Sequence, residues 1–270
     1  MILGDYHTHT VYCDGNNTPR EMVQAALEMG LPAIGFTGHG ETAFDYSYCM
    51  TKENTAKYVE DISALKAEYD GRIDVLCGIE TDIYSPIIEH NFDYVIGSAH
   101  YVKVGNDYCV VDIDFDTFKD VLNNRFGGDA LAFCESYFEG VSRTKELVDC
   151  DILGHFDLVT KFNELEPLID VTDKRYINAA TDALDVLLKT DVVFEVNSGA
   201  ISRGYRTSPY PAPFILRYIR EKKGRIIING DTHNKNNLCC DFENSLALVK
   251  ECGFKSVMGI NKNGFYEIKI

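Results

Sequence analysis

Short apolar runs that alternate with amphipathic stretches are the feature of this sequence that most constrains its fold. Each run has the length of a strand, and apolar residues between the runs recur at helical spacing, as in residues 172–189. Alternating strands and helices predict βαβ units around a parallel sheet, which is an α/β fold. The seven candidate strands are residues 2–8, 33–38, 73–79, 94–99, 151–156, 192–196 and 226–230.

This alternation continues along the chain without a linker rich in serine, glycine or proline. We therefore expect residues 1–270 to form a single domain. Two segments are longer than the connections of a minimal barrel. Residues 41–50 are rich in aromatic side chains, and residues 102–115 alternate in a way that predicts a hairpin. Both follow the C-terminal ends of candidate strands, where the lid of a pocket would be expected.

The composition of the chain argues against some classes of function and location. The 270 residues carry a net charge of −16 with only 26 lysines and arginines, which argues against a nucleic-acid partner. The apolar runs are shorter than the ~18 residues of a membrane span, and the first residues do not resemble a signal peptide. We therefore expect a cytoplasmic location without membrane contact. The nine cysteines, without regular spacing, are expected to be reduced. The oligomeric state is left open, with a homodimer as one candidate.

Side chains that bind metals stand where the candidate strands end. His7 and His9 close the first run, and their spacing of two places both on one face of a strand. Six of the seven histidines occupy such positions, and His90 is interpreted as a surface residue. Because the carboxyl ends of parallel barrel strands share one face, these side chains are expected to meet. The full set is His7, His9, Asp14, His39, Glu80, His100, His155, Asp231 and His233.

Such a set suits divalent metal ions. It offers nine nitrogen or oxygen donors and no sulfur. Because one ion uses three or four protein ligands, two or three ions are predicted, with Glu80 as a candidate bridge. Zinc, manganese and ferrous iron all accept these ligands. Clustered ions acidify bound water and neutralise phosphoryl charge, which favours hydrolysis of a phosphate ester. Taken one at a time, each residue could also be an ordinary buried polar group.

Candidate phosphate contacts follow the fifth and sixth runs. Arg203 comes after the sixth run and could hold phosphate oxygens with its guanidinium group, and Lys161 follows the fifth. Residues 13–17 form a short loop before a helix whose predicted cap is Thr18. Asn17 is a third candidate because helix N-termini attract anions. The alternatives are solvated side chains at Arg203 and Lys161 and a plain turn at Asn17.

These motifs, in their order along the chain, resemble a known family. The chain reads Asp-x-His-x-His-Thr, Thr-Gly-His, Gly-Ile-Glu, Gly-Ser-x-His, Gly-His-Phe-Asp, Glu-Val-Asn-Ser-Gly and Gly-Asp-x-His. This ordered set resembles the PHP (polymerase and histidinol phosphatase) superfamily and extends from His7 to His233. Within the superfamily, the length of the chain and its Gly-His-Phe-Asp-Leu segment are similar to those of histidinol-phosphate phosphatases.

The resemblance implies a distorted seven-stranded (β/α)7 barrel, similar to a TIM barrel, with three metal ions. By position, it implies that Glu80 bridges the first two ions and that Arg203 contacts phosphate. The implied ligand sets are His7, His9, Glu80 and Asp231; Glu80, His100 and His155; and Asp14, His39 and His233. The chain departs from the family at Asp14, where many members have histidine, and near Lys161, where arginine is common.

The activity implied is hydrolysis of L-histidinol phosphate to L-histidinol and phosphate, a step of histidine biosynthesis, with a hydroxide held between metal ions as the nucleophile. Asp231 and a metal-bound water are both candidates for protonating the leaving group. Arg203 and Lys161 are candidates for stabilising the phosphoryl group. Two other functions are open: a phosphoesterase for a nucleotide or another small phosphate ester, and a metal-stabilised interaction domain without catalysis.

Overall fold

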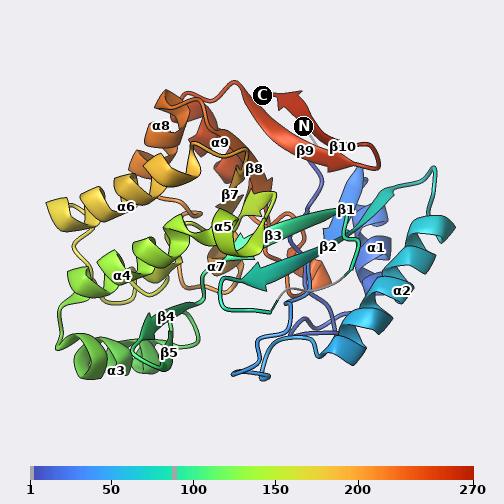
Figure 1. The fold of residues 1–270 in the computed structure, drawn as a ribbon. Coiled ribbons are helices and arrows are strands. Elements are labelled where there is room, and N and C mark those ends of the chain that lie inside the picture. Colours follow the sequence, from blue (N-terminus) through green and yellow to red (C-terminus); the bar gives the residue numbers. More distant parts are fainter. Residues whose placement is uncertain (1–2, 87–89) are drawn as a thin grey trace.

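The computed structural model of the chain describes residues 3–86 and 90–270. Its centre is a curled eight-stranded sheet (Figure 1). Neighbouring strands run parallel except for the last pair. In spatial order the strands are β1 (Ala33–Phe36), β2 (Asp74–Asp82), β3 (Tyr94–Ser98), β6 (Ile152–Leu153), β7 (Val193–Asn197), β8 (Arg225–Asn229), β9 (Ser256–Asn261) and β10 (Gly264–Lys269). The predicted barrel-like α/β fold is confirmed, with a slightly different number of strands.

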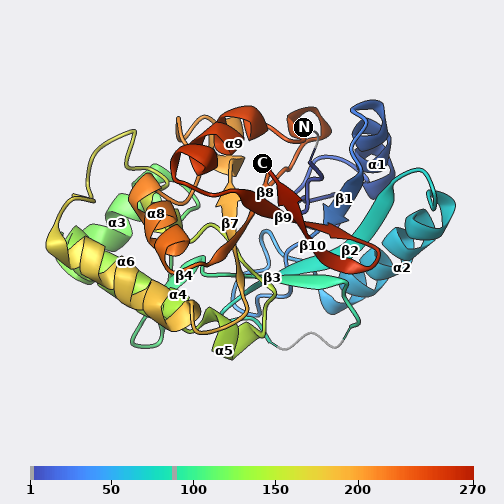
Figure 2. The same cartoon turned by 90° about the horizontal axis from the view of Figure 1, so that it is seen from above.

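Helices cover the sheet on two sides (Figures 1 and 2). On one side, α1 (Pro19–Glu28) and α2 (Lys52–Glu68) lie beside β1 and β2. The other side carries α3 (Phe115–Phe126), α4 (Ala130–Ser142), α5 (Thr144–Val148), α6 (Lys174–Leu187) and α8 (Pro213–Glu221). The short α7 (Gly199–Ser202) and α9 (Phe242–Glu251) follow β7 and β8. The predicted start of α1 is confirmed, because the Thr18 side chain accepts a hydrogen bond from the backbone N–H of Glu21. In the described part of the chain, no helix is long and apolar enough to cross a membrane.

The first candidate strand departs most from the prediction. Residue 2 lies outside the described residues, and the rest of the run forms only isolated parallel bridges, at Asp5 to β1 and at Thr8 to Thr232. In this segment a side chain replaces a neighbouring strand as the partner of the backbone. The Tyr6 N–H donates to Asn229 Oδ1 at 3.3 Å. Residues 5–9 therefore connect β1 with the residues that follow β8, without being a regular strand.

The run at 151–156 is also shorter than predicted, since β6 contains only two residues. The backbone N–H of His155 donates to Glu195 Oε2 at 2.9 Å instead of pairing with a neighbouring strand. Conversely, β9 and β10 are strands that the sequence pattern did not predict. β9 continues the sheet beyond β8, and β10 pairs with it as an antiparallel edge.

The inward face of the sheet is apolar at one end and polar at the other. On β2, Leu76 lies in the interior cluster, and Glu80 follows four residues later on the same face. The alternate residues Val75, Cys77 and Ile79 face outward and belong to the cluster that contains residues of α2. We call the interior cluster the apolar layer; it consists of Tyr6, Ala33, Leu76, Tyr94, Ile96, Ile152, Val193, Ile227 and Ile260. We call the buried ionisable residues at the other end the polar layer; it contains His7, Glu80, Glu195 and Asp231.

Two segments outside the sheet lie beside the polar layer. The predicted hairpin is confirmed as β4 (Tyr101–Val104) and β5 (Asp107–Val110), which form a separate antiparallel pair. Residues 41–50 contact this hairpin through aromatic rings, because Phe44 stacks on Tyr108 with ring centroids 3.8 Å apart. The Tyr101 hydroxyl also donates to Asp45 Oδ2 at 2.9 Å. The two segments therefore support each other.

Candidate metal centre

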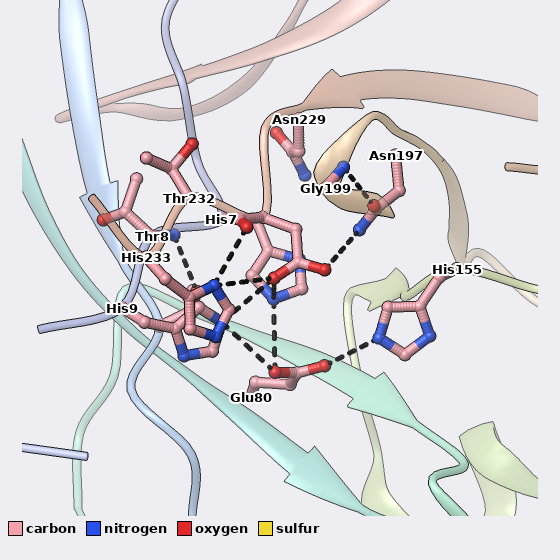
Figure 3. Close-up of polar contacts among 12 residues, drawn as sticks. His7, Thr8, His9, Glu80, His155, Asn197, Gly199, Asn229, Thr232 and His233 are labelled. Carbon is pink, nitrogen blue, oxygen red and sulfur yellow. Dashed lines mark hydrogen bonds and ion pairs between the residues drawn. The ribbon is translucent and has the colours of Figure 1, made fainter. Parts of the chain in front are cut away.

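Glu80, near the end of β2, lies at the centre of the polar layer (Figure 3) and is only 1% exposed. Its Oε2 lies 3.2 Å from His7 Nε2 and 3.0 Å from His39 Nδ1. Its Oε1 lies 3.1 Å from His155 Nε2 and 3.5 Å from His100 Nε2. Oε2 also lies 3.6 Å from His9 Nε2, so it faces three imidazoles and Oε1 faces two, as in a carboxylate that could be shared between two cations.

A second group surrounds Asp14, in the loop before α1. Asp14 Oδ1 lies 3.6 Å from His9 Nδ1 and 3.7 Å from His39 Nε2, and Oδ2 lies 3.2 Å from His233 Nε2. The rings of His9 and His233 stack with centroids 4.1 Å apart. Asp231 joins this group to the first, because its Oδ1 lies 3.4 Å from His9 Nε2. The structure thus brings all nine predicted metal-binding side chains into one cluster.

The donor atoms of this cluster fit metal ions. His7 Nε2 and His9 Nε2 are buried and have no hydrogen-bond partner among the described residues. Because buried polar atoms are rarely left unpaired, an ion bound to these nitrogens would satisfy them. Three overlapping groups have donor atoms within 4.8 Å of one another: His9, Asp14, His39 and His233; His7, His9 and Glu80; and His39, Glu80 and His100. His9 and His39 each belong to two groups, whereas the family resemblance assigned each to one ion.

The carboxylates of the cluster are held in their charged form. Burial alone would raise the pKa of Glu80, but the imidazoles around it, His7 foremost, hold that pKa well below its ordinary value. Burial would also raise the pKa of Asp231, but Arg203 and then His7 hold it well below the usual range. Both groups are therefore ready to bind cations. An ionised Asp231 accepts protons, so this environment does not favour it as the proton donor for a leaving group.

His9 is held in its neutral form. Burial, and then the neighbouring His233 and His39, lower the pKa of His9 to about 3. A neutral imidazole keeps one nitrogen lone pair, which is the form that binds a metal. Burial would also lower the pKa values of His39 and His100, but the neighbouring Glu80 raises both, that of His100 to about 9. Binding of a divalent ion by these imidazoles would therefore release protons.

Glu195, on β7, is a site residue to which the sequence analysis assigned no role. Its Oε1 lies 2.6 Å from His7 Nδ1. Burial would raise the pKa of Glu195, but His7 keeps it below its ordinary value. Because an ionised carboxylate only accepts hydrogen bonds, His7 Nδ1 carries the proton, which leaves Nε2 to face Glu80. The position of Glu195 at a strand end was a visible signal, but its partner lies 188 residues away. Asp82 lies beside His100: its Oδ2 accepts from the His100 backbone N–H at 2.7 Å and lies 3.4 Å from Nδ1 of the ring.

The backbone is unusual at Asp231, whose φ of 47° lies in the left-handed region. Gly199, at the start of α7, faces this residue closely. A Cβ added to Gly199 would lie 2.7 Å from Asp231 Cβ, which is too close for any side chain. Backbone strain of this kind persists only where the surrounding structure fixes it, and it is often found at functional sites.

The cluster forms one wall of a pocket of about 250 Å³. Arg203 also lines this pocket and is bound to the cluster, with Nη2 3.0 Å from Asp231 Oδ2 and Nη1 3.0 Å from His233 Nδ1. Lys161 lines it as well, but its ammonium group contacts Asp112, 3.3 Å from Oδ2, and also donates to the Asp112 backbone carbonyl. Two of the three predicted phosphate contacts therefore reach the pocket, each already paired with an aspartate.

Asn17 is the predicted phosphate contact that the structure does not bring to the pocket. Its side-chain oxygen accepts a hydrogen bond from the backbone N–H of Lys235 at 2.9 Å. This bond fixes the loop before α1 against the turn after β8, which helps to place Asp14 and His233 side by side. His90 is exposed, in agreement with its interpretation as a surface residue.

Comparison with known proteins identifies the family. A family model described as "PHP domain" matches residues 5–199. The chain belongs to the PHP domain family. The match includes every candidate metal-binding residue from His7 to His155, while Arg203, Asp231 and His233 lie beyond it.

Histidinol-phosphatases match this PHP chain over nearly its whole length. A protein of Deinococcus radiodurans named "Probable histidinol-phosphatase" is 29% identical over 94% of this chain and 95% of its own. The histidinol-phosphatase of Bacillus subtilis is 22% identical over 93% of this chain and 100% of its own. The crystal structure of a histidinol phosphate phosphatase from Lactococcus lactis, complexed with zinc, L-histidinol and phosphate, has a TM-score of 0.71 at 20% identity over 98% of both chains. This structural likeness shows a shared fold.

Proposed function

We propose that this PHP protein is a phosphoric monoester hydrolase that converts L-histidinol phosphate to L-histidinol and phosphate, as in histidine biosynthesis. The observation that carries the proposal is the presence, in one pocket, of a buried cluster of metal-binding side chains and an arginine that could hold phosphate. The likeness to histidinol-phosphatases along nearly the whole chain supports the choice of substrate. We also propose that residues 1–270 act as one domain, since strands from residue 33 to residue 269 share one sheet.

The proposal includes two or three divalent ions, with zinc, manganese and iron as candidates. The residues that would hold them are His7, His9, Asp14, His39, Glu80, His100, His155, Asp231 and His233. The unpaired nitrogens and the ionised carboxylates of the cluster support this assignment. When bound, such ions lower the pKa of a coordinated water toward neutrality and neutralise the charge of the phosphoryl group.

The other residues of the pocket would bind and orient the ester. Arg203 would direct its guanidinium group at phosphate oxygens, from a position fixed by its bond to Asp231. Lys161 would add positive charge at the same rim, although Asp112 neutralises part of it. Glu195 would keep His7 in the tautomer that leaves Nε2 for an ion.

The test is a comparison of substrates on purified protein loaded separately with zinc, manganese or ferrous iron. Metal stoichiometry and kcat/KM are measured for L-histidinol phosphate, a mononucleotide, a sugar phosphate and p-nitrophenyl phosphate. We expect L-histidinol phosphate to be preferred by roughly 10²-fold or more, since a site built around polar groups of its substrate rejects analogues strongly. Similar efficiency on several unrelated esters would contradict the substrate assignment. Bound metal without turnover of any ester would instead support a non-catalytic domain.

A further inference from the structure

The wall of the pocket formed by residues 41–50 and 101–113 differs in character from the metal cluster. It contributes two tyrosines, Tyr48 and Tyr101, and two aspartates, Asp45 and Asp112. The Tyr48 ring lies edge-on to the His39 ring, with centroids 4.8 Å apart, so this wall begins directly beside the cluster. Neither aspartate belongs to the groups whose donor atoms could share a metal ion. The wall therefore combines aromatic surface with acidic groups that the metal chemistry does not use.

The two aspartates have different partners. Asp112 is paired with Lys161, which is itself only 6% exposed. Asp45 accepts hydrogen bonds only from neutral groups: the Ser47 N–H at 3.0 Å, the Ser47 hydroxyl at 2.6 Å and the Tyr101 hydroxyl at 2.9 Å. Within residues 3–86 and 90–270, no lysine or arginine forms an ion pair with it. Of the two acidic groups on this wall, Asp45 is thus the one whose charge is not neutralised.

The surroundings of Asp45 preserve that charge and fix its direction. Partial burial would raise the pKa of Asp45, but the hydrogen bonds from Ser47 and then from Tyr101 hold it below its ordinary value. Both oxygens are oriented by these bonds, and each carboxylate oxygen can accept more than one. A fixed, ionised and incompletely paired carboxylate in a small pocket is suited to bind an organic cation.

We propose that Asp45 binds the ammonium group of the substrate, so that the site selects phosphate monoesters that also carry an amine. This inference rests on the proposed function and names the part of the substrate that gives it specificity. With the phosphate at Arg203 and the metal cluster, the amine would meet Asp45 and the ring of the substrate would lie against Tyr48 and Tyr101. Nucleotides and sugar phosphates bring no cation to this wall, and a second phosphate would be repelled by it.

Two esters that differ only in the amine test the proposal: L-histidinol phosphate and 3-(imidazol-4-yl)propyl phosphate. Both carry the same imidazole, so the ratio of their kcat/KM values isolates recognition of the ammonium group. We expect wild type to prefer L-histidinol phosphate by roughly 10- to 100-fold, which is the usual range for a hydrogen bond to a charged group. In Asp45→Asn this preference should fall to near unity, mainly through a higher KM for L-histidinol phosphate.

A control on the same loop distinguishes this contact from a general loss of charge. Glu41→Gln removes the same formal charge, but Glu41 accepts from the Tyr46 hydroxyl and does not line the pocket, so the preference should persist. Tyr101→Phe removes one hydrogen bond that orients Asp45 and should reduce the preference only in part. Metal stoichiometry and Tm of each variant establish that the fold is intact.

The outcomes separate this inference from the proposed function. If wild type hydrolyses L-histidinol phosphate but shows no preference over the deaminated ester, the function stands and the role of Asp45 is overturned. If wild type shows the preference and a folded Asp45→Asn retains it, another group binds the amine and the inference is again overturned. If metal-loaded wild type hydrolyses neither ester, the proposed function fails and this inference fails with it.

Discussion

The apolar and polar layers of the sheet stand on the same strands and face the same interior, yet they have opposite energetic roles. On β2, Leu76 belongs to the apolar layer, and Glu80, four residues later, belongs to the polar layer. Asp231 follows Ile227 of β8 by the same interval, two residues beyond the end of that strand. Burial of the apolar layer stabilises the fold whatever is bound. Burial of the polar layer costs free energy that a bound cation offsets. On β2, two residues only four positions apart thus have different roles: Leu76 contributes to folding stability and Glu80 to ligand binding.

The largest effect should come from Glu80→Gln, which removes the charge at the centre of the polar layer but keeps the shape of the side chain. Removing one partner from a buried charged group costs about 3–5 kcal/mol. We therefore expect kcat/KM to fall on the order of 10³-fold and the metal stoichiometry to fall with it. Elemental analysis and steady-state kinetics measure both. A variant that is fully active and fully loaded with metal would show that Glu80 is not a ligand.

The matched change in the apolar layer is Leu76→Ala, on the same strand and the same face. We expect the free energy of unfolding of the metal-free protein to fall by about 2–5 kcal/mol, because the side chain is 1% exposed and leaves a cavity. Urea unfolding measures this change. Metal stoichiometry and kcat/KM of the folded fraction should stay close to wild type. If they collapse in a folded protein, the two layers are not independent.

A smaller effect is expected for Glu195→Gln, because Glu195 acts on the cluster only through the residues that it orients. An amide can both donate and accept hydrogen bonds, so the glutamine would no longer fix the tautomer of His7. The affinity for metal should therefore fall roughly 10- to 100-fold. Competition with a chelator of known affinity measures this. Asp185→Asn is a suitable control, since Asp185 is a carboxylate on α6 whose partners are the Tyr218 hydroxyl and Lys222, and it does not line the pocket. Equal metal affinity in both variants would remove Glu195 from the site.

The smallest effect is expected for Arg203→Lys, which retains the charge but loses the forked geometry. The structure changes what can be expected of this residue, because Arg203 is bonded to Asp231 and is not a free loop side chain. A lysine still neutralises Asp231, so metal content and Tm should change little. The loss of one charge-assisted hydrogen bond to phosphate should lower kcat/KM by roughly tenfold. Unchanged kinetics would mean that Arg203 serves only to hold Asp231.

Much of the fold could be predicted because strand and helix periodicity are local signals. The runs at residues 33–38 and 226–230 correspond to β1 and β8, and the capping residues marked the start of α1. The convergence of histidines also followed from one rule, that parallel strands end on one face. β10 escaped prediction because it is an antiparallel edge strand without a buried residue, so its sequence has no continuous apolar run.

The rest of the site depends on partners that are distant in sequence. Nothing near Glu195 in the sequence reveals its bond to His7. Nothing near Lys161 reveals its pairing with Asp112, 49 residues away, which leaves its ammonium group less free for phosphate than the sequence suggested. The irregular first strand has the same origin, because the side chain of Asn229 accepts from its backbone. Such contacts are set by tertiary packing rather than by local propensity.

Residues 5–9, which connect β1 with the residues that follow β8, affect when the site can assemble during translation. The Asp5 carboxylate accepts hydrogen bonds from the backbone N–H groups of Gly230, at 2.9 Å, and Cys239, at 3.1 Å. Gly230 leaves the ribosome 225 residues after Asp5, which is on the order of 10 to 45 seconds at ~5–20 residues per second. During that interval His7 and His9 are already outside the ribosome, while Asp231 and His233 have yet to be made. The ion-binding face therefore stays incomplete until Asp231 and His233 have emerged, and a site with all of its candidate ligands can form only after that point.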